Sequence, residues 1–266
     1  MMLKNNMFSC VGKLLVAGLL VAYGNAGYAQ SNVQRRADTL MTELVKAETD
    51  SLKISYADEL GRLLTVLKPA DYDLLRPVKY LNYKKSPLTG AEMFSWQIQL
   101  TEGAAFYHVF KFGGIRKDVV WRYLPGEQTE IPDYLFYDWL AFKTGKKYSY
   151  ILFGWSETAK TNRKGLWVVD FAANGKVNFN RRLLRKGNRR TAFLVFEYGK
   201  EVNMMLKHDR KGKRIIFDHL SPAESRYADY FMFYGPDGEV NALELRKGEW
   251  WFTDKVKIKN TGNELR

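Results

Sequence analysis

The sequence is poor in cysteine and proline. Its 266 residues include one Cys, seven Pro and 21 Gly. A single cysteine excludes a disulfide scaffold, and the low content of Gly and Pro excludes a collagen-like or low-complexity chain. With 46% hydrophobic and 15% aromatic residues, the chain is also too apolar for a disordered tail. We therefore expect a globular protein that is stabilised by a hydrophobic core.

The first 29 residues resemble a secretory signal peptide. Lys4 and Lys13 precede an apolar run at residues 14–22, and small residues follow it, with Gly27 and Ala29 at the positions of an A-x-A-like cleavage site. The run is about half the roughly 20 residues that span a bilayer, so a permanent membrane helix is the less favoured interpretation. The sequence predicts a signal peptide over residues 1–29, cleaved after Ala29.

Cleavage of this leader would change the net charge of the chain and remove its one cysteine. The leader contains Lys4, Lys13 and no acid, so its removal lowers the formal net charge from +13 to +11. Cys10 precedes the apolar run, whereas a lipid-accepting cysteine would follow it, so we expect a mature protein without a thiol, a lipid anchor or a transmembrane helix. The predicted location is the periplasm or the outside of the cell, including the outer-membrane surface.

Residues 30–77 are expected to be helical. Apolar residues recur at helical spacing on both sides of a break at residues 49–51, and Ser55 has the features of an N-cap. Two interpretations are open: a helix pair that packs on the rest of the protein, which we favour, or a projecting coiled-coil arm that binds a partner.

Residues 78–259 are expected to form a β-rich domain, followed by a polar tail at 260–266. Short runs of Val, Ile, Phe, Tyr and Trp alternate with turn residues, which is typical of strands joined by hairpins. The predicted strands cover residues 78–83, 92–100, 105–112, 149–155, 166–171, 192–197, 203–208, 214–218, 230–234, 240–245 and 250–254.

The predicted fold class is α+β, mainly antiparallel β. An N-terminal helix pair is followed by a β-meander that forms a sandwich or an open barrel. Hairpin turns are expected at Asn174-Gly175, Lys211-Gly212, Asp237-Gly238 and Lys247-Gly248. The segment Pro132 to Lys143 is ambiguous, and we interpret it as a short helix across one end of the sheet.

Several sequence blocks over residues 78–254 occur in an order that resembles a family of uncharacterised secreted proteins of Bacteroidota-type bacteria. The blocks are Phe94-Ser95-Trp96, residues 110–112, residues 148–155 (YSYILFGW), residues 196–198, residues 216–222, residues 233–238 and residues 247–250. The resemblance implies an exported envelope protein. It implies no assigned activity and no catalytic residues.

Signatures of catalysis are scarce. The sequence has no zinc-protease, nucleophile-elbow, phosphate-loop or dinucleotide motif, and none of its three histidines stands at metal-ligand spacing, so no cofactor and no metal are predicted. Asp218 and His219 are a possible general-base pair, although hydrogen bonds to the backbone are the simpler role. A glycosidase needs two carboxylates. Candidates are Asp118, Glu130, Asp133, Asp138, Asp170, Glu197 and Asp218.

Positive charge is the most pronounced local feature. Six cations fall within ten residues: Arg181, Arg182, Arg185, Lys186, Arg189 and Arg190. Such a cluster attracts polyanions, while a solvated loop that keeps the protein soluble is the alternative. In an exported protein the expected partner is an envelope protein, an anionic glycan or lipopolysaccharide. Nucleic acid is not expected, because no recognisable module presents interleaved aromatics.

These observations favour a binding or scaffold protein of the cell envelope over an enzyme, with residues 181–190 as the contact. The competing hypothesis is an envelope hydrolase that acts on glycans through a carboxylate pair or through Asp218 and His219. A pocket that contains two acids would favour the hydrolase, whereas a basic face with exposed aromatics would favour the binding protein.

Overall fold

The computed structural model describes residues 32–67, 78–112, 117–127, 132–210 and 213–258. The predicted leader (1–29), the polar tail (260–266) and the turn at Lys211-Gly212 lie outside the described residues. The chain divides into two compact units, residues 1–81 and 82–266. The fold class is confirmed, because a helix pair is followed by mostly antiparallel sheets, one of which curls into a half-barrel.

The described part of the first unit contains a helix over residues 32–46 and helix α2 (Asp50–Val66). Their buried residues recur at spacings of three and four, which places them on one face of each helix: Ala37, Leu40, Met41 and Leu44, then Ala57, Leu60, Gly61 and Leu64. Arg36 and Glu59 form an ion pair between the helices.

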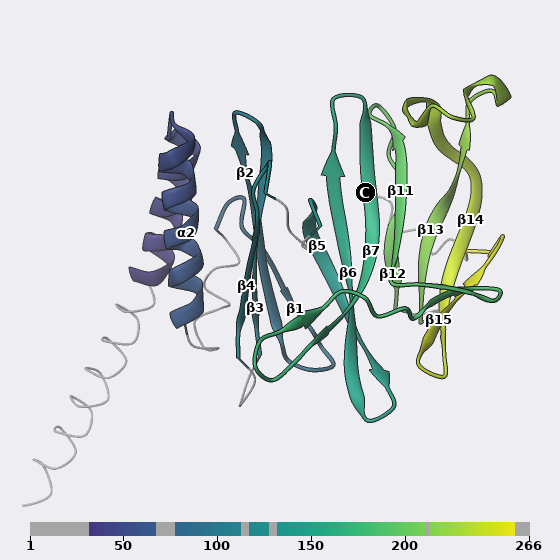
Figure 1. Cartoon of the computed structure of the whole chain (residues 1–266), viewed down its shortest axis with the longest axis horizontal. Helices are drawn as coiled ribbons and strands as arrows, with labels where there is room; N and C mark the ends of the chain where they lie inside the picture. Colours follow the sequence, from purple (N-terminus) through teal and green to yellow (C-terminus); the bar gives the residue numbers. More distant parts are fainter. Residues whose placement is uncertain (1–31, 68–77, 113–116, 128–131, 211–212, 259–266) are drawn as a thin grey trace, which may run out of the picture. The chain divides into compact units, whose positions relative to one another are not determined.

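The second unit contains three sheets (Figure 1). A four-stranded sheet has the order β1-β2-β3-β4, formed by β1 (Asn82–Lys85), β2 (Glu92–Leu100), β3 (Gly103–Lys111) and β4 (Val119–Tyr123). A five-stranded sheet has the order β11-β7-β6-β5, with β8 added beside β7; its strands are β5 (Leu135–Thr144), β6 (Lys147–Glu157), β7 (Thr161–Phe171), β8 (Val177–Asn178) and β11 (Phe193–Gly199).

The third sheet has six strands in the order β10-β9-β15-β14-β13-β12. These are β9 (Leu184–Lys186), β10 (Arg189–Thr191), β12 (Leu206–Asp209), β13 (Arg214–Pro222), β14 (Tyr234–Arg246) and β15 (Glu249–Thr253). Two short 3-10 helices, η2 (Ser225–Tyr227) and η3 (Phe231–Phe233), connect β13 to β14. All strand pairs are antiparallel except β15 with β9.

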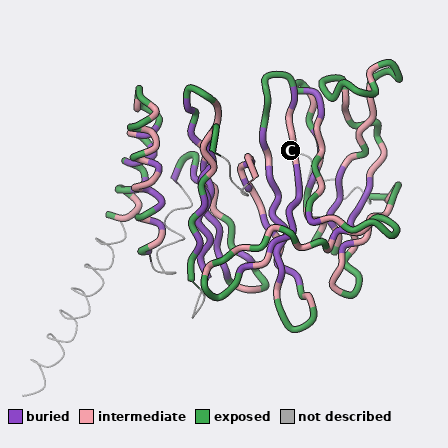
Figure 2. The backbone as a smooth tube through the Cα atoms, viewed as in Figure 1, coloured by how far each residue is buried: buried purple, intermediate pink, exposed green. Residues whose placement is uncertain are grey.

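The five-stranded sheet is covered on both faces, and the middle parts of its strands β6 and β7 are buried (Figure 2). On one face, residues such as Trp139 and Leu152 pack with Met93 and Phe110 of the four-stranded sheet. On the other face, Phe153 packs in a second core that includes Trp250 of the six-stranded sheet. A strand that is buried on both faces needs no polar alternation. This arrangement explains the nearly continuous apolar run at residues 150–155.

Five local predictions are wrong. The strand predicted over residues 78–83 begins only at Asn82, because residues 78–81 form a bend and a turn in which Tyr80 has φ 66°. Residues 135–144 form strand β5 instead of a helix, because they pair along β6. Residues 231–233 are a 3-10 helix instead of a strand. Gly238 lies within β14 instead of at a hairpin turn. Ser55 lies inside α2, whose N-cap is Thr49; the Thr49 side chain accepts a hydrogen bond from the Leu52 amide.

The cation-rich segment also has an unexpected conformation. Residues 184–191 form the short hairpin β9–β10, whose turn contains Gly187 at φ 57°. The chain leaves the five-stranded sheet after β8, pairs with the six-stranded sheet through β9, and returns to the five-stranded sheet as β11. This excursion connects two layers and creates the surface described next. Within the described residues, no helix has the length and apolar character that crossing a membrane requires.

Candidate functional site

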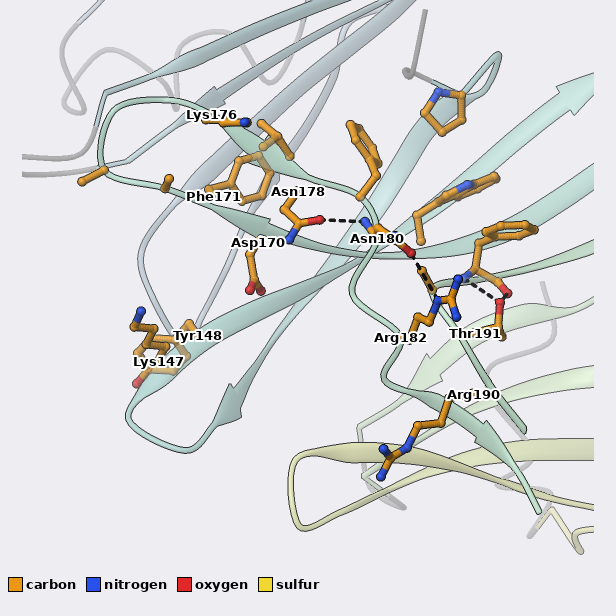
Figure 3. Close-up of a pocket in the computed structure, with 18 of the residues that line it drawn as sticks. Lys147, Tyr148, Asp170, Phe171, Lys176, Asn178, Asn180, Arg182, Arg190 and Thr191 are labelled. Carbon is orange, nitrogen blue, oxygen red and sulfur yellow. Dashed lines mark hydrogen bonds between the residues drawn. The ribbon is translucent and has the colours of Figure 1, made fainter. Parts of the chain in front are cut away.

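A groove of about 1540 Å³ follows the excursion of the chain between β8 and β11 (Figure 3). Lys147 and Tyr148 lie on one side, Arg182 and Arg190 on the other, and Asp170 of β7 between them. Its lining also includes the turn after β7 and the start of β11. The groove therefore combines elements from the five-stranded and six-stranded sheets of one unit.

Positive charge dominates the groove. The lining contains six cations and one acid; the cations are Lys146, Lys147, Lys176, Arg182, Arg189 and Arg190. Arg190 is paired with Glu249, with 2.8 Å between its Nη2 and a carboxylate oxygen. Among the residues that the structure describes, the other five cations have no ion pair. An anion that enters the groove therefore meets several charges that the protein does not neutralise itself.

Asp170 is the acid of the groove, and its charge is already offset. Its Oδ2 lies 2.8 Å from Nε of Arg181, which is outside the lining. Its Oδ1 is buried and has no hydrogen-bond partner in the described part of the chain. Because Oδ1 is enclosed by the protein and Arg181 pairs with Oδ2, Asp170 contributes an already neutralised carboxylate to the groove.

Aromatic rings provide the apolar part of the lining. Trp167 and Phe171 are buried, Tyr148 and Phe179 are half-buried, and Phe193 is 54% exposed. Trp167 is held in place because its ring packs against Tyr134 at a centroid distance of 4.4 Å. Aromatic faces bind the apolar faces of sugars and other rings, while neighbouring cations bind the anionic groups.

Gly165 permits the position of the Trp167 ring. A Cβ atom at Gly165 would lie 2.4 Å from the ring of Trp167 and 3.1 Å from the backbone oxygen of Leu194. Such distances are shorter than van der Waals contact, so the residue at this position has no room for a side chain.

The orientation of Arg182 follows from two consecutive side-chain contacts in the segment after β8 (Figure 3). Asn178 Oδ1 accepts a hydrogen bond from the Asn180 amide at 2.9 Å, and Asn180 Oδ1 accepts one from Arg182 Nε at 3.5 Å. The first contact is a bond between a side chain and the backbone, which is the kind that fixes irregular segments, and the second joins two side chains. They leave the terminal nitrogens of Arg182 available to a ligand.

The structure separates the six cations predicted from the sequence into two groups. Arg181 pairs with Asp170, Arg185 and Arg190 share Glu249, and Lys186 lies 4.2 Å above the ring of Phe252. Arg182 and Arg189 line the groove without an acidic partner among the described residues. The fold also places Lys146, Lys147 and Lys176 in the groove, and none of these belongs to the cluster predicted from the sequence.

Arg185 has a structural role. Its guanidinium lies 4.0 Å above the ring of Trp251, and its Nη1 lies 3.2 Å from Glu249. The preceding residue of β15, Trp250, is 1% exposed, so the two adjacent tryptophans face opposite sides of the strand. Arg185 therefore covers the tryptophan that points away from the core.

Asp218 and His219 do not form a catalytic pair. Asp218 Oδ2 accepts a hydrogen bond from the Met205 amide at 2.7 Å, whereas His219 Nδ1 lies 2.6 Å from Asp237. The simpler role that the sequence suggested for Asp218, a hydrogen bond to the backbone, is correct. His219 bonds to a side chain instead.

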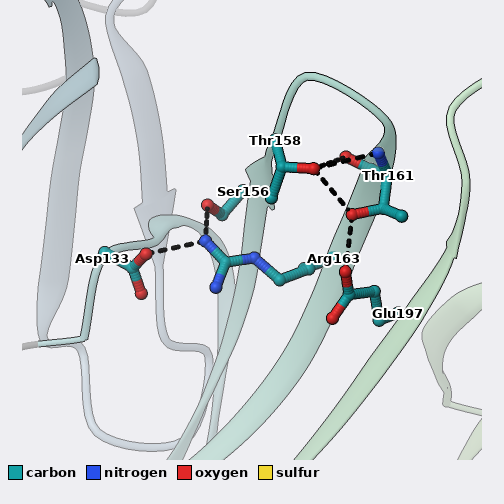
Figure 4. Close-up of polar contacts among 6 residues, drawn as sticks. All are labelled: Asp133, Ser156, Thr158, Thr161, Arg163 and Glu197. Atoms are coloured by element: carbon teal, nitrogen blue, oxygen red, sulfur yellow. Dashed lines mark hydrogen bonds and ion pairs between the residues drawn. The ribbon is translucent and has the colours of Figure 1, made fainter. Parts of the chain in front are cut away.

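Two of the candidate carboxylates, Asp133 and Glu197, lie near Arg163 (Figure 4). Arg163 Nη2 lies 2.7 Å from Asp133 and also donates to Ser156 Oγ, while Glu197 accepts a hydrogen bond from Thr161 at 2.6 Å. Each carboxylate is thus already bound by a neighbour. Of the other candidates, Glu130 lies outside the described residues, and Asp170 is the acid among the described residues that line the groove.

The comparisons with known proteins identify no relative. No family model, no curated protein and no solved structure matches the chain. The resemblance to secreted Bacteroidota-type proteins therefore stays a prediction from the sequence. The geometry and charge of the groove are the features that bear on function.

Proposed function

We propose that the protein is an exported cell-envelope protein that binds an anionic glycan in the groove between β8 and β11. The observation that carries this proposal is a lining that combines five cations without an acidic partner among the described residues with accessible aromatic rings, above all Phe193 and Tyr148. Sulfate, phosphate or carboxylate groups of the ligand bind the cations, and sugar rings contact the aromatic faces.

The concave shape favours a glycan over a protein partner. A groove surrounds an extended chain of sugar rings, whereas most protein interfaces are broader and flatter. Phe193 and Tyr148 are accessible enough to contact such rings. The phosphorylated sugars of lipopolysaccharide have the same chemistry. A protein partner is the alternative outcome of the test below.

Hydrolysis has less support than binding. A glycosidase requires two carboxylates about 5 to 10 Å apart on either side of the bond that is cleaved. The described lining of the groove contains one carboxylate, and Arg181 neutralises it. Asp218 and His219 contact different partners, as described above.

The test is a binding measurement with the mature chain (residues 30–266). A heparin-derived hexasaccharide is the anionic probe, maltohexaose is the neutral control of equal length, and purified lipopolysaccharide distinguishes the two sources of anionic sugar. We expect the hexasaccharide to bind and its affinity to fall as salt is raised from 50 to 300 mM. Equal binding of maltohexaose, or binding of neither sugar, would contradict the proposal.

Two matched triple variants locate the site. Replacing Lys147, Arg182 and Arg189 by Ala removes three groove cations, and we expect a loss of affinity of at least tenfold. The control replaces three exposed lysines outside the groove with Ala, which removes the same total charge: Lys84, Lys207 and Lys257. If the two triple variants lose affinity equally, net charge and not the groove is responsible. A protein captured from envelopes by the wild type but not by the groove variant would support the scaffold alternative.

Export is tested separately. N-terminal sequencing of protein from cells should give a chain that begins at Gln30, because Ala29 is the predicted cleavage position. An intact N-terminus on cytosolic material would contradict the envelope location and leave the binding result unaffected.

A further inference from the structure

A second polar cluster lies on the six-stranded sheet, away from the residues that line the groove. His219 of β13 and Asp237 and Glu239 of β14 each offer a ligand atom, and these atoms lie within 4.8 Å of one another. His219 and Asp237 are 18 positions apart in the chain, so they show no metal-ligand spacing in the sequence. Pairing of β13 with β14 brings them together.

The backbone at this position is adapted to bring the side chains together. Asp218 pairs with Val240 and Leu220 with Pro236, so the single residue His219 lies opposite the three residues 237–239. Gly238 has φ 90°, and a Cβ there would meet nothing within 4 Å, so the conformation and not a steric contact calls for glycine. Such bulges redirect side chains at functional positions.

The carboxylate of Asp237 is held in a fixed orientation. Its Oδ1 accepts a hydrogen bond from the Glu239 amide at 3.0 Å, and its Oδ2 lies 2.6 Å from His219 Nδ1. One oxygen is therefore bound by the backbone while the other faces the imidazole. This arrangement resembles the way outer hydrogen bonds orient the ligands of metal sites.

Positive charge already occupies the cluster. Lys255 Nζ lies 2.7 Å from Glu239 Oε1, and the exposed Lys255 has a left-handed backbone at φ 51°, with its amide donating to Asn241 Oδ1. Two adjacent carboxylates repel each other unless a cation lies between them or beside them. In the metal-free protein Lys255 and the N–H of His219 fulfil this role. A divalent ion would offset both carboxylates from a single position.

We propose that His219, Asp237 and Glu239 form a zinc site. One imidazole nitrogen and two carboxylate oxygens are ligands that zinc accepts, and an imidazole is not a preferred ligand of magnesium or calcium. Zinc bonds of about 2.0–2.1 Å place tetrahedral ligand atoms about 3.3 Å apart, so small side-chain rotations bring the three ligands together. The side chains are partly exposed, so water completes the coordination, and Lys255 is released to solvent.

The experiment is a calorimetric titration of the metal-free mature protein with Zn²⁺. We expect one equivalent to bind, and we expect His219→Ala and Glu239→Gln each to weaken binding at least tenfold. The matched control is His208→Ala, because His208 lies on β12 and is not part of the cluster. Lys255→Ala should bind zinc more tightly, since it removes the competing cation.

Three results would overturn the proposal. They are the absence of zinc binding by the wild type, equal affinity of the wild type and His219→Ala, and binding of Ca²⁺ or Mg²⁺ as tight as that of Zn²⁺, which would show that the imidazole is not a ligand. If a variant does not fold, an NMR measurement on the wild-type protein tests the same proposal. Among the three histidines, the NMR signals of His219 alone should move when zinc is added.

Discussion

The buried His108 makes the stability of the protein depend on pH in a way that can be calculated. His108 is on β3 and is 0% exposed; its Nε2 lies 3.1 Å from the Tyr134 carbonyl, and its ring packs 4.7 Å from that of Phe136. Because a carbonyl only accepts, Nε2 carries a proton. Nδ1 is buried and has no hydrogen-bond partner in the described part of the chain, so the buried ring is neutral. Burial lowers the pKa of His108 from 6.5 to about 3.

The sign and size of the effect follow from linkage. Between pH 6.5 and about 3, the imidazole is protonated in the unfolded chain but not in the folded protein, so stability falls as pH falls through this range. The slope approaches about 1.4 kcal/mol per pH unit. For an unfolded pKa of 6.5, the folded protein loses about 2 kcal/mol between pH 7 and pH 5 through His108.

The perturbation is His108→Gln, which keeps an N–H donor for the Tyr134 carbonyl but does not titrate. Urea unfolding at pH 7, 6 and 5, followed by tryptophan fluorescence, gives the free energy of unfolding of both proteins. The wild type should lose about 2 kcal/mol more than the variant between pH 7 and pH 5. His208, whose pKa is also lowered by burial, contributes equally to both and cancels.

Parallel pH profiles of the two proteins would refute this reasoning. If the variant does not fold, an NMR titration of the wild type tests whether His108 becomes protonated in the folded protein. The imidazole signals of His108 should stay constant between pH 8 and pH 4.5, and a midpoint near 6.5 would show that the folded protein accepts the proton.

The remaining predictions concern packing around the groove and the core. Gly165→Ala should lower the free energy of unfolding by about 1–3 kcal/mol in urea and weaken hexasaccharide binding, because its Cβ would displace Trp167. Phe153→Ala should lower it by about 3–5 kcal/mol by the same measurement, since Phe153 is 1% exposed in the second core. Arg185→Ala should reduce Tm by about 2–4 °C in thermal unfolding, because it removes the contacts with Trp251 and Glu249, whereas Arg189→Ala should leave Tm nearly unchanged.

The fold class was accessible to sequence reasoning because it depends on local periodicity. Helical spacing over residues 32–66 and short β-branched and aromatic runs after residue 78 each reflect which side of a single element is buried. Where local pattern was compatible with two structures, the prediction failed. Residues 135–144 carry aromatics at spacings that suit a helix, and only the pairing with β6 makes them a strand.

Only part of the candidate site could be predicted from the sequence. The cluster at residues 181–190 was visible as a run of charge, but the run does not show which cations already have acidic partners. Glu249 follows Arg185 by 64 residues, and the parallel pairing of β9 with β15 brings the two together. Lys147 and Trp167 join the groove through the packing of two sheets.

Composition and periodicity were thus enough to determine a basic protein with a helix pair and a mainly antiparallel β-rich region, since these properties depend on neighbours within one strand or helix. The tertiary structure decided which cations are neutralised, where a groove opens, and that His219 meets Asp237 and Glu239. These properties depend on strand register and on the stacking of sheets, which join residues far apart in the chain.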